Sequence, residues 1–186
     1  SIMYASWQNG ALNRSDNYGQ NFKGIRAADG GAWITPFQVS PLNHRMIVAG
    51  YKAVFLSGNM GDNWNQISPE LTPDGWLTEI AFAPSEDKYI YVSGGSSLWG
   101  TKDRGESWDL LSKNLPNLYI EDIIVSPSEP DKVWVCLSGY SEEEKIFVSE
   151  DGGKNWSNYS TGLPNVPVNS MTINRLSNYA LYAGTD

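Results

Sequence analysis

The segment Ser149-Glu150-Asp151-Gly152-Gly153-Lys154-Asn155-Trp156 decides the fold, because three earlier segments, 15–22, 57–64 and 101–108, repeat its pattern. The pattern is a hydroxyl residue, any residue, Asp or Asn, any residue, Gly, any two residues, and a large aromatic residue. The copies start at positions 15, 57, 101 and 149, so 42, 44 and 48 residues separate them. A repeat of this length, with short β-rich segments between the copies, predicts an all-β fold of the β-propeller type.

Each copy has the chemistry of a self-capped β-hairpin turn. The Asp or Asn side chain can accept hydrogen bonds from backbone N–H groups of its own turn. The glycine permits a positive φ, and the aromatic residue begins the next strand, where we expect it to be well buried beside its own hairpin. These roles are structural rather than catalytic or metal-binding. The residues concerned are Ser15, Asn17, Gly19, Phe22, Ser57, Asn59, Gly61, Trp64, Thr101, Asp103, Gly105, Trp108, Ser149, Asp151, Gly153 and Trp156.

With the motif as an anchor, each repeat divides into four strands, as in a four-stranded antiparallel blade. The first strand is predicted over 34–39, 77–82, 120–125 and 168–173, and the second over 46–49, 89–92, 133–137 and 180–183. The third strand is predicted over 54–56, 98–100 and 146–148, and the fourth follows the motif aromatic. The chain is thus one propeller segment, 1–186, with blades at about 1–32 (partial), 33–75, 76–118, 119–166 and 167–186 (partial).

The four motifs resemble the Asp-box, or BNR repeat, of sialidases, sortilin-type receptors, xyloglucan-cleaving hydrolases and secreted bacterial glycosyl-hydrolase-like proteins. The resemblance covers nearly the whole chain, although Asn17 and Asn59 stand where the family usually has Asp. It implies a secreted or cell-surface propeller whose ligand site lies on the face opposite the Asp-box hairpins. It says little about activity, because enzymes and non-enzymes share the repeat.

Composition narrows the classes of partner. The formal net charge is −8, which argues against nucleic acid or an anionic membrane as the main partner. Cys136 is the only cysteine and His44 the only histidine, so the sequence predicts no disulfide, no zinc site, no Ser-His-Asp triad and no other cofactor. No run of 18 apolar residues is present, and we expect no membrane insertion.

The order of strands along the chain suggests a segment of a larger propeller. The opening stretch, 2–7, aligns with a second strand, and so does the last apolar run, 180–183. This predicts three whole blades, three strands before them and two after them, with the remaining blades supplied by the same parent protein. The alternative is a closed four-bladed ring, in which strand 168–173 completes the first blade.

The resemblance directs attention to the loops that join the fourth strand to the next first strand, together with loops 94–97 and 139–144. Aligned first strands place Trp33, Trp76 and Tyr119 at one repeat-equivalent position. Such aromatic residues can form a platform for a carbohydrate or protein ligand. The alternative is that they are spacers between blades. The longer loops to consider are 24–33, 68–76, 112–119 and 160–167.

Glu79, Glu121 and Asp122 are weak candidates for catalysis, since two carboxylates across a channel can serve as acid and base in glycoside hydrolysis. The alternative is a solvated lining or a hydrogen-bonding role. A sialidase needs an arginine cluster for its substrate carboxylate. The Phe/Tyr-Arg-Ile-Pro motif of sialidases is absent. The chain has five arginines: Arg14, Arg26, Arg45, Arg104 and Arg175.

Two functions therefore remain open. The first is a non-catalytic extracytoplasmic module that binds a protein or a glycan. The second is part of a glycoside hydrolase with channel-facing carboxylates. The sequence favours the first, since neither an arginine cluster nor a recognisable acid pair is visible.

Overall fold

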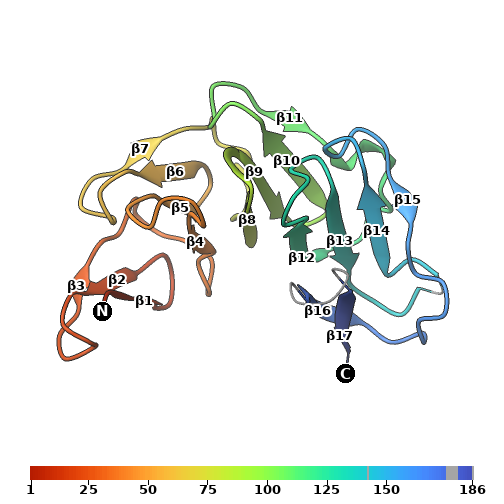
Figure 1. Cartoon of the computed structure of the whole chain (residues 1–186), viewed down its shortest axis with the longest axis horizontal. Coiled ribbons are helices and arrows are strands. Elements are labelled where there is room, and N and C mark those ends of the chain that lie inside the picture. The colour runs from red at the N-terminus through yellow and green to blue at the C-terminus, as the bar shows by residue number, and fades with distance from the viewer. Residues whose placement is uncertain (142, 175–179, 186) are drawn as a thin grey trace. The chain divides into compact units, whose positions relative to one another are not determined.

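The computed structural model describes residues 1–141, 143–174 and 180–185, which form β-strands, connecting loops and one short 3-10 helix, η1 (Ser112–Asn114) (Figure 1). The chain divides into two compact units, residues 1–80 and 81–186. Glu142, in loop 139–144, and Arg175 lie outside the described residues.

The first unit contains a three-stranded and a four-stranded antiparallel sheet, each with its strands in chain order. The three-stranded sheet is β1 (Met3–Ser6), β2 (Leu12–Ser15) and β3 (Lys23–Gly24). The four-stranded sheet is β4 (Phe37–Val39), β5 (Ile47–Gly50), β6 (Val54–Ser57) and β7 (Asn65–Gln66).

Three further sheets follow. The first, whose β8 crosses the boundary between the units, is β8 (Glu79–Ala83), β9 (Glu86–Gly94), β10 (Ser97–Thr101) and β11 (Asp109–Leu110). The second is β12 (Ile120–Val125), β13 (Val133–Leu137), β14 (Ile146–Ser149) and β15 (Ser157–Asn158). The last is the pair β16 (Val168–Ile173) and β17 (Leu181–Thr185). The three four-stranded antiparallel sheets confirm the predicted four-stranded blades; three strands precede them and two follow them.

Strand burial follows the position of each strand in its sheet. All five residues of β13 are buried, as an apolar strand requires when both faces are covered. The fourth strands are two residues long and exposed, and such short edges limit pairing with other chains. The first strand β4 begins at Phe37 instead of the predicted Ile34, because Pro36 has no N–H for a ladder and offers only its carbonyl to Gly50.

Apolar side chains of neighbouring sheets form the cores. In the first unit, Leu12 and Ile25 pack with Ala49 and Tyr51. In the second, one core joins residues of β8–β11 to β12–β14, and another joins β12–β14 to β16 and β17. The Cys136 side chain is buried in the latter core, as predicted.

Each of the four motif turns has the same pattern of internal hydrogen bonds, which confirms the predicted self-capping. The Ser149 hydroxyl donates to Asp151 Oδ1 at 2.8 Å and accepts the Gly153 N–H at 2.8 Å. Asp151 Oδ1 also accepts the Asn155 N–H at 2.9 Å. The same bonds recur in the turns that start at Ser15, Ser57 and Thr101. The glycine φ lies between +81° and +95° in all four turns, so the turn requires glycine at this position.

The prediction that the motif aromatics are well buried beside their own hairpins is wrong. Phe22 is 49% exposed, and Trp64, Trp108 and Trp156 are half-buried. The indole Nε1 of Trp64 donates to the Ile25 carbonyl at 2.7 Å, and that of Trp156 donates to the Leu111 carbonyl at 2.9 Å. Ile25 and Leu111 each follow the fourth strand of the preceding sheet. These two tryptophans therefore pack against the preceding blade, where an indole N–H has a carbonyl to bind.

Candidate functional site

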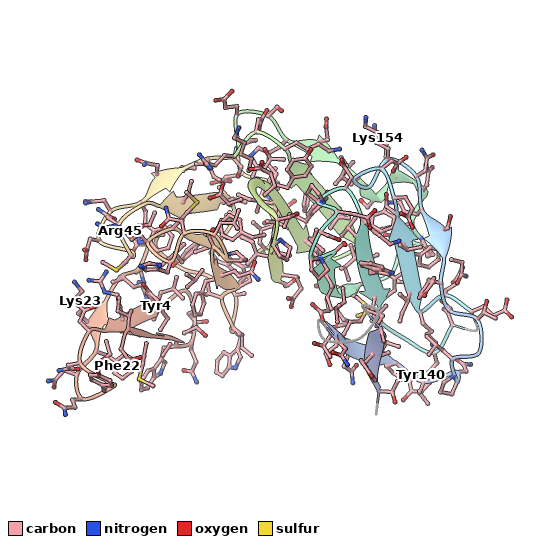
Figure 2. All side chains as sticks on the ribbon, viewed as in Figure 1. Tyr4, Phe22, Lys23, Arg45, Tyr140 and Lys154 are labelled. Carbon is pink, nitrogen blue, oxygen red and sulfur yellow. The ribbon has the colours of Figure 1, made fainter. Side chains whose placement is uncertain are left out.

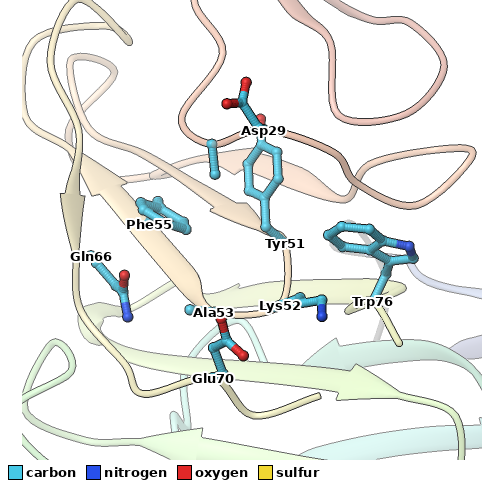
Figure 3. Close-up of a pocket in the computed structure, with 9 residues that line it drawn as sticks. Asp29, Tyr51, Lys52, Ala53, Phe55, Gln66, Glu70 and Trp76 are labelled. Atoms are coloured by element: carbon cyan, nitrogen blue, oxygen red, sulfur yellow. The ribbon is translucent and has the colours of Figure 1, made fainter. Parts of the chain in front are cut away.

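A pocket of about 150 Å³ lies in the first unit, between loops 24–33 and 68–76, which the sequence analysis singled out. The turn between β5 and β6 forms its third side. Figure 3 shows the side chains around it. The lining residues are Ala28, Asp29, Tyr51, Lys52, Ala53, Phe55, Gln66, Glu70 and Trp76.

Tyr51 forms the rigid floor of this pocket. Its side chain is 1% exposed, its hydroxyl donates to the Gly10 carbonyl at 2.8 Å, and it accepts the Ala27 N–H at 3.2 Å. Its ring meets Phe55 edge to face, with centroids 5.6 Å apart. Burial raises the pKa of the Tyr51 phenol. The hydroxyl is thus occupied by backbone partners and holds loop 24–33 on the sheet.

Trp76 lies at one side of the pocket and is held by its own chain. The Lys52 ammonium stands over the indole, 5.7 Å from the ring centroid, and donates to the Pro73 carbonyl at 2.6 Å. A Cβ placed on Gly30 would lie 2.7 Å from the Trp76 ring, and Gly30 has a φ of +72°. Trp76 is therefore packed between loop 24–33 and the β5–β6 turn.

The rim of the pocket is polar. Asp29, Gln66 and Glu70 are exposed and surround a floor made by Tyr51 and Ala53. The rim thus carries two carboxylates and one amide; Asp29 lies 3.6 Å from the Arg26 guanidinium, and the Gln66 amide donates to the Ser68 carbonyl at 2.7 Å. Lys52 is the one basic residue among the lining side chains.

The other two predicted platform residues are exposed. Trp33 is 66% exposed in the first unit, and Tyr119 is 57% exposed in the second. Trp33 and Trp76 thus belong to one unit and Tyr119 to the other. The three-residue platform stays a prediction.

The acidic candidates differ in their surroundings. Asp122 Oδ2 accepts the Met171 N–H at 2.7 Å, and Oδ1 accepts the Ile123 N–H at 2.8 Å. Burial raises the pKa of Asp122, and these two hydrogen bonds act in the opposite direction. Glu121 is half-buried in the same strand, and Glu79 is half-buried at the start of β8. Asp122 therefore ties β12 to β16, which is the hydrogen-bonding alternative stated above.

Sequence reasoning named the two loops but missed the residues that shape the pocket. Tyr51 and Lys52 lie in a connection of three residues, Tyr51–Ala53, between two clear strands. The one available signal is the aromatic and basic pair Tyr51-Lys52 in a turn between a second and a third strand, which is equivalent to loops 94–97 and 139–144 of the later repeats. Glu70 lies in the predicted loop 68–76, where its acidic side chain could have been noted.

A second charged cluster joins the first two motif turns. The Arg14 side chain is 4% exposed, and its guanidinium contacts Asp16 at 2.8 Å and Asp62 at 3.2 Å. Lys23 binds Asp62 at 2.9 Å. Because Arg14 and Asp16 belong to one blade and Asp62 to the next, this cluster is an interblade clamp, and sequence reasoning gave it no role.

Two further observations concern partners. No helix among the described residues is long and apolar enough to cross a bilayer. Within residues 1–141, 143–174 and 180–185, no three His, Cys, Asp or Glu side chains gather as metal ligands would.

The chain was compared with known proteins. No family model and no curated protein sequence matches it. Solved structures do. An ancestral GH74 enzyme superposes with a TM-score of 0.73 at 16% identity, over 99% of this chain and 26% of the enzyme. The GH74 xyloglucanase of Xanthomonas campestris gives 0.72 at 19% identity, over 99% and 32%.

YCF48 from Cyanidioschyzon merolae is also similar, with a TM-score of 0.64 at 16% identity, over 93% of this chain and 60% of YCF48. A YCF48 bound to D1 peptide gives 0.63 at 17% identity, over 98% and 58%. The chain thus spans about a quarter to three-fifths of the length of these proteins. At such identities the likeness establishes the fold, and the chain has the blades of a β-propeller.

Proposed function

We propose that this chain is a non-catalytic propeller module that binds a protein segment in the pocket of its first unit. The main support for this proposal is that the pocket has a buried aromatic floor, Tyr51, and two exposed carboxylates, Asp29 and Glu70, on its rim. A pocket of about 150 Å³ has the size of one side chain rather than of a drug-sized ligand. The ligand we expect is a peptide with a basic side chain.

Charge and aromatic geometry support this choice. The net charge of −8 attracts basic partners over a distance. A sugar ring stacks on a free aromatic face, whereas Lys52 stands over Trp76 and the ring also lies against Gly30. The YCF48 bound to D1 peptide is a precedent for peptide binding by a protein of similar fold.

Carbohydrate binding and glycoside hydrolysis are the second candidate. The observations that favour it are the exposed Trp33 and the structural likeness to GH74 enzymes. Asp122 argues against hydrolysis, because each of its two carboxylate oxygens already accepts a backbone N–H.

We also propose that the four turns are Asp-box (BNR) repeats, as in sortilin-type and sialidase-type propellers. The hydrogen bonds common to the four turns support this assignment. We propose together with this assignment that the protein is secreted or lies at the cell surface, and that the same parent protein has further blades. The chain is then the single propeller segment described above.

The test is a screen of the chain on a peptide array and a glycan array, followed by titration of the hits. We expect binding of Lys- or Arg-containing peptides that weakens at least about tenfold in Glu70→Gln, as loss of one charged contact predicts. Glu129→Gln is the matched control, because Glu129 is also exposed but lies in the second unit. Equal loss in both variants would contradict a specific site.

A second pair of variants separates the two ligand classes. Trp33→Ala removes an indole that is 66% exposed, and Trp7→Ala removes one that is 69% exposed elsewhere in the same unit. Glycan binding that is lost in Trp33→Ala alone would favour carbohydrate. Peptide binding that survives both substitutions but fails in Glu70→Gln would support the proposal.

A further inference from the structure

Two junctions between blades occupy equivalent positions but carry opposite charges. The first is the interblade clamp of the first unit, where the Arg14 guanidinium lies between the carboxylates of Asp16 and Asp62. Lys23 completes this clamp by binding Asp62 at 2.9 Å. The second junction lies within the second unit, where the motif turn 149–156 meets the segment that follows β11. Its residues correspond to those of the clamp one by one.

Strand register identifies the first two equivalent positions. Arg14 lies opposite Lys23 in the pair β2–β3, and Gly100 lies opposite Asp109 in the pair β10–β11. Arg14 and Gly100 each directly precede the first residue of a motif turn. Gly100 therefore stands where the clamp has Arg14, and Asp109 stands where the clamp has Lys23.

The motif sequences identify the other two positions. Asp16 is the second residue of its motif, and Lys102 has that place in the turn 101–108. Asp62 follows the glycine of its motif, and Lys154 has that place in the turn 149–156. A cation between two carboxylates in the first unit thus corresponds to a glycine between two lysines in the second.

The second junction contains a groove. A pocket of about 270 Å³ lies between β11, η1 and the motif turn, and a smaller pocket of about 20 Å³ beside it reaches Gly100 and Lys102. Both pockets are lined by Asp109, Leu111 and Lys154, so they form one continuous groove, which we call the lysine groove. Because position 100 carries no side chain, no central charge corresponds to the guanidinium of the clamp.

Leu111 holds the two segments that carry the outer lysines of this groove. Its side chain is 8% exposed, and a Cβ placed on Gly153 would lie 2.9 Å from Leu111 Cδ1. Lys154 directly follows this glycine, and Figure 2 shows it projecting from the turn. Lys113 lies in η1, which begins directly after Leu111. The backbone that carries the two lysines is therefore fixed, although their side chains are exposed.

Four charged side chains line the lysine groove. Lys102 forms an ion pair with Asp131, which neutralises it. Lys113 and Lys154 form no ion pair with any of the described residues, and Asp109 has no ion-pair partner within the described part of the chain. The unpaired groups are thus two ammonium groups and one carboxylate, a local excess of positive charge in a protein whose net charge is −8.

We propose that the lysine groove binds a sulfate or phosphate group between Lys113 and Lys154. Each lysine acts as a point charge toward an oxyanion, and several acceptor oxygens on one group allow both ammonium groups to contact it. The Asn114 amide also lines the groove and can donate to a further oxygen. The bound anion supplies the central charge that Gly100 omits, with the signs of the clamp reversed.

The surroundings limit the affinity of this site. The Asp109 carboxylate opposes an anion in the groove, and the acidic protein as a whole repels anions over a distance. We therefore expect weak but saturable binding. The groove is also larger than one oxyanion, so it has room for a small organic body that carries the charged group.

The probe is sodium sulfate, titrated into the full chain while the backbone amide signals are followed by NMR. Sodium chloride keeps the ionic strength constant, because added salt screens exposed charges. We expect saturable shifts at Lys113, Asn114 and Lys154, and the same shifts with inorganic phosphate. Acetate, which carries a single charge, should bind at least about fivefold more weakly. Sulfate shifts that do not saturate, or equal binding of acetate, would overturn the proposal.

Four variants test the assigned contacts. Lys113→Gln and Lys154→Gln should each weaken sulfate binding at least about fivefold, because each removes one charged contact. Asp109→Asn should tighten binding about twofold or more, because it removes the opposing carboxylate. Lys88→Gln is the matched control, since Lys88 is exposed in the same unit but does not line the groove. Unchanged binding in Lys154→Gln, or an equal loss in Lys88→Gln, would overturn the site.

Two further titrations identify the source of the anion. A glucose monosulfate and a glucose monophosphate carry the same groups on a small organic body. Tighter binding of either ester than of its free ion, lost in Lys154→Gln, would show that the groove takes an ester. Equal or weaker binding of the esters, with sulfate binding retained, would show that it takes the free ion.

Discussion

At the scale of single residues, one hydroxyl group organises each motif turn. Ser149 is 1% exposed, accepts two backbone N–H groups and donates to Asp151. Removing its oxygen leaves the Gly153 N–H without a partner in a buried place. We expect Ser149→Ala to lower the free energy of unfolding by about 1–3 kcal/mol.

Urea denaturation measures this change. Ser157→Ala, in an exposed two-residue strand, is the matched control and should alter the free energy of unfolding by less than about 0.5 kcal/mol. Similar losses in the two variants would show that the turn network contributes little.

The turn carboxylates predict how stability depends on pH. Hydrogen bonds from Ser107, and from Thr101, lower the pKa of Asp103 to about 2, and bonds from Asn155 lower that of Asp151 to about 2. Because these values lie below the ordinary Asp value, the ionised turns stabilise the fold above about pH 4, and this contribution is lost as pH falls from about 4 to 2.

Asn17 and Asn59 show that the turn accepts an amide in place of the carboxylate. We expect the double variant Asp103→Asn, Asp151→Asn to have a flatter profile of thermal midpoint against pH between 4 and 2. Superimposable acid profiles for the variant and the parent would contradict the assignment.

Replacing Asp122 tests whether its carboxylate has a structural or a catalytic role. An amide at this position can accept one backbone N–H, but its NH₂ group would face the other. We expect Asp122→Asn to cost about 1–3 kcal/mol of stability, while Glu121→Gln costs less than about 1 kcal/mol. An Asp122→Asn protein of parental stability, measured by denaturant unfolding, would return Asp122 to the list of candidate acids.

At the scale of elements, the motif aromatics join neighbouring blades. Trp156→Phe keeps most of the apolar contact but removes the donor to Leu111, and we expect a loss of about 1–2 kcal/mol. Phe22→Ala removes a half-exposed ring and should cost less than about 1 kcal/mol. The same denaturation experiment measures both. A larger loss at Phe22 would mean that the ring has a role that its exposure does not suggest.

Much of this element-scale organisation could be predicted from the sequence. β12, β13 and β16 have the predicted bounds, because alternating or wholly apolar runs between turn residues define a strand locally. The partner of Trp156 could not be predicted, because the Leu111 carbonyl belongs to another blade. The pocket was predictable only as a pair of loops, since the placement of Tyr51 and Lys52 depends on contacts with residues distant in sequence.

At the scale of the whole molecule, the repeat establishes the fold, and the loops of the first unit supply the candidate site. The GH74 enzymes and YCF48 share the fold at 16–19% identity. Function therefore depends on the particular side chains of this chain. Here those side chains are an aromatic floor, a lysine packed on Trp76 and two rim carboxylates.

One measurement tests the proposed binding function most directly: an NMR titration of the tryptophan indole N–H signals with the best peptide and glycan hits, in which the ligand signals are followed in the same tube. We predict that a basic peptide moves the Trp76 signal, that this shift disappears in Glu70→Gln, and that no new ligand signals arise. New reducing-end signals from a glycan, lost in Asp122→Asn or Glu79→Gln with the fold intact, would contradict the account.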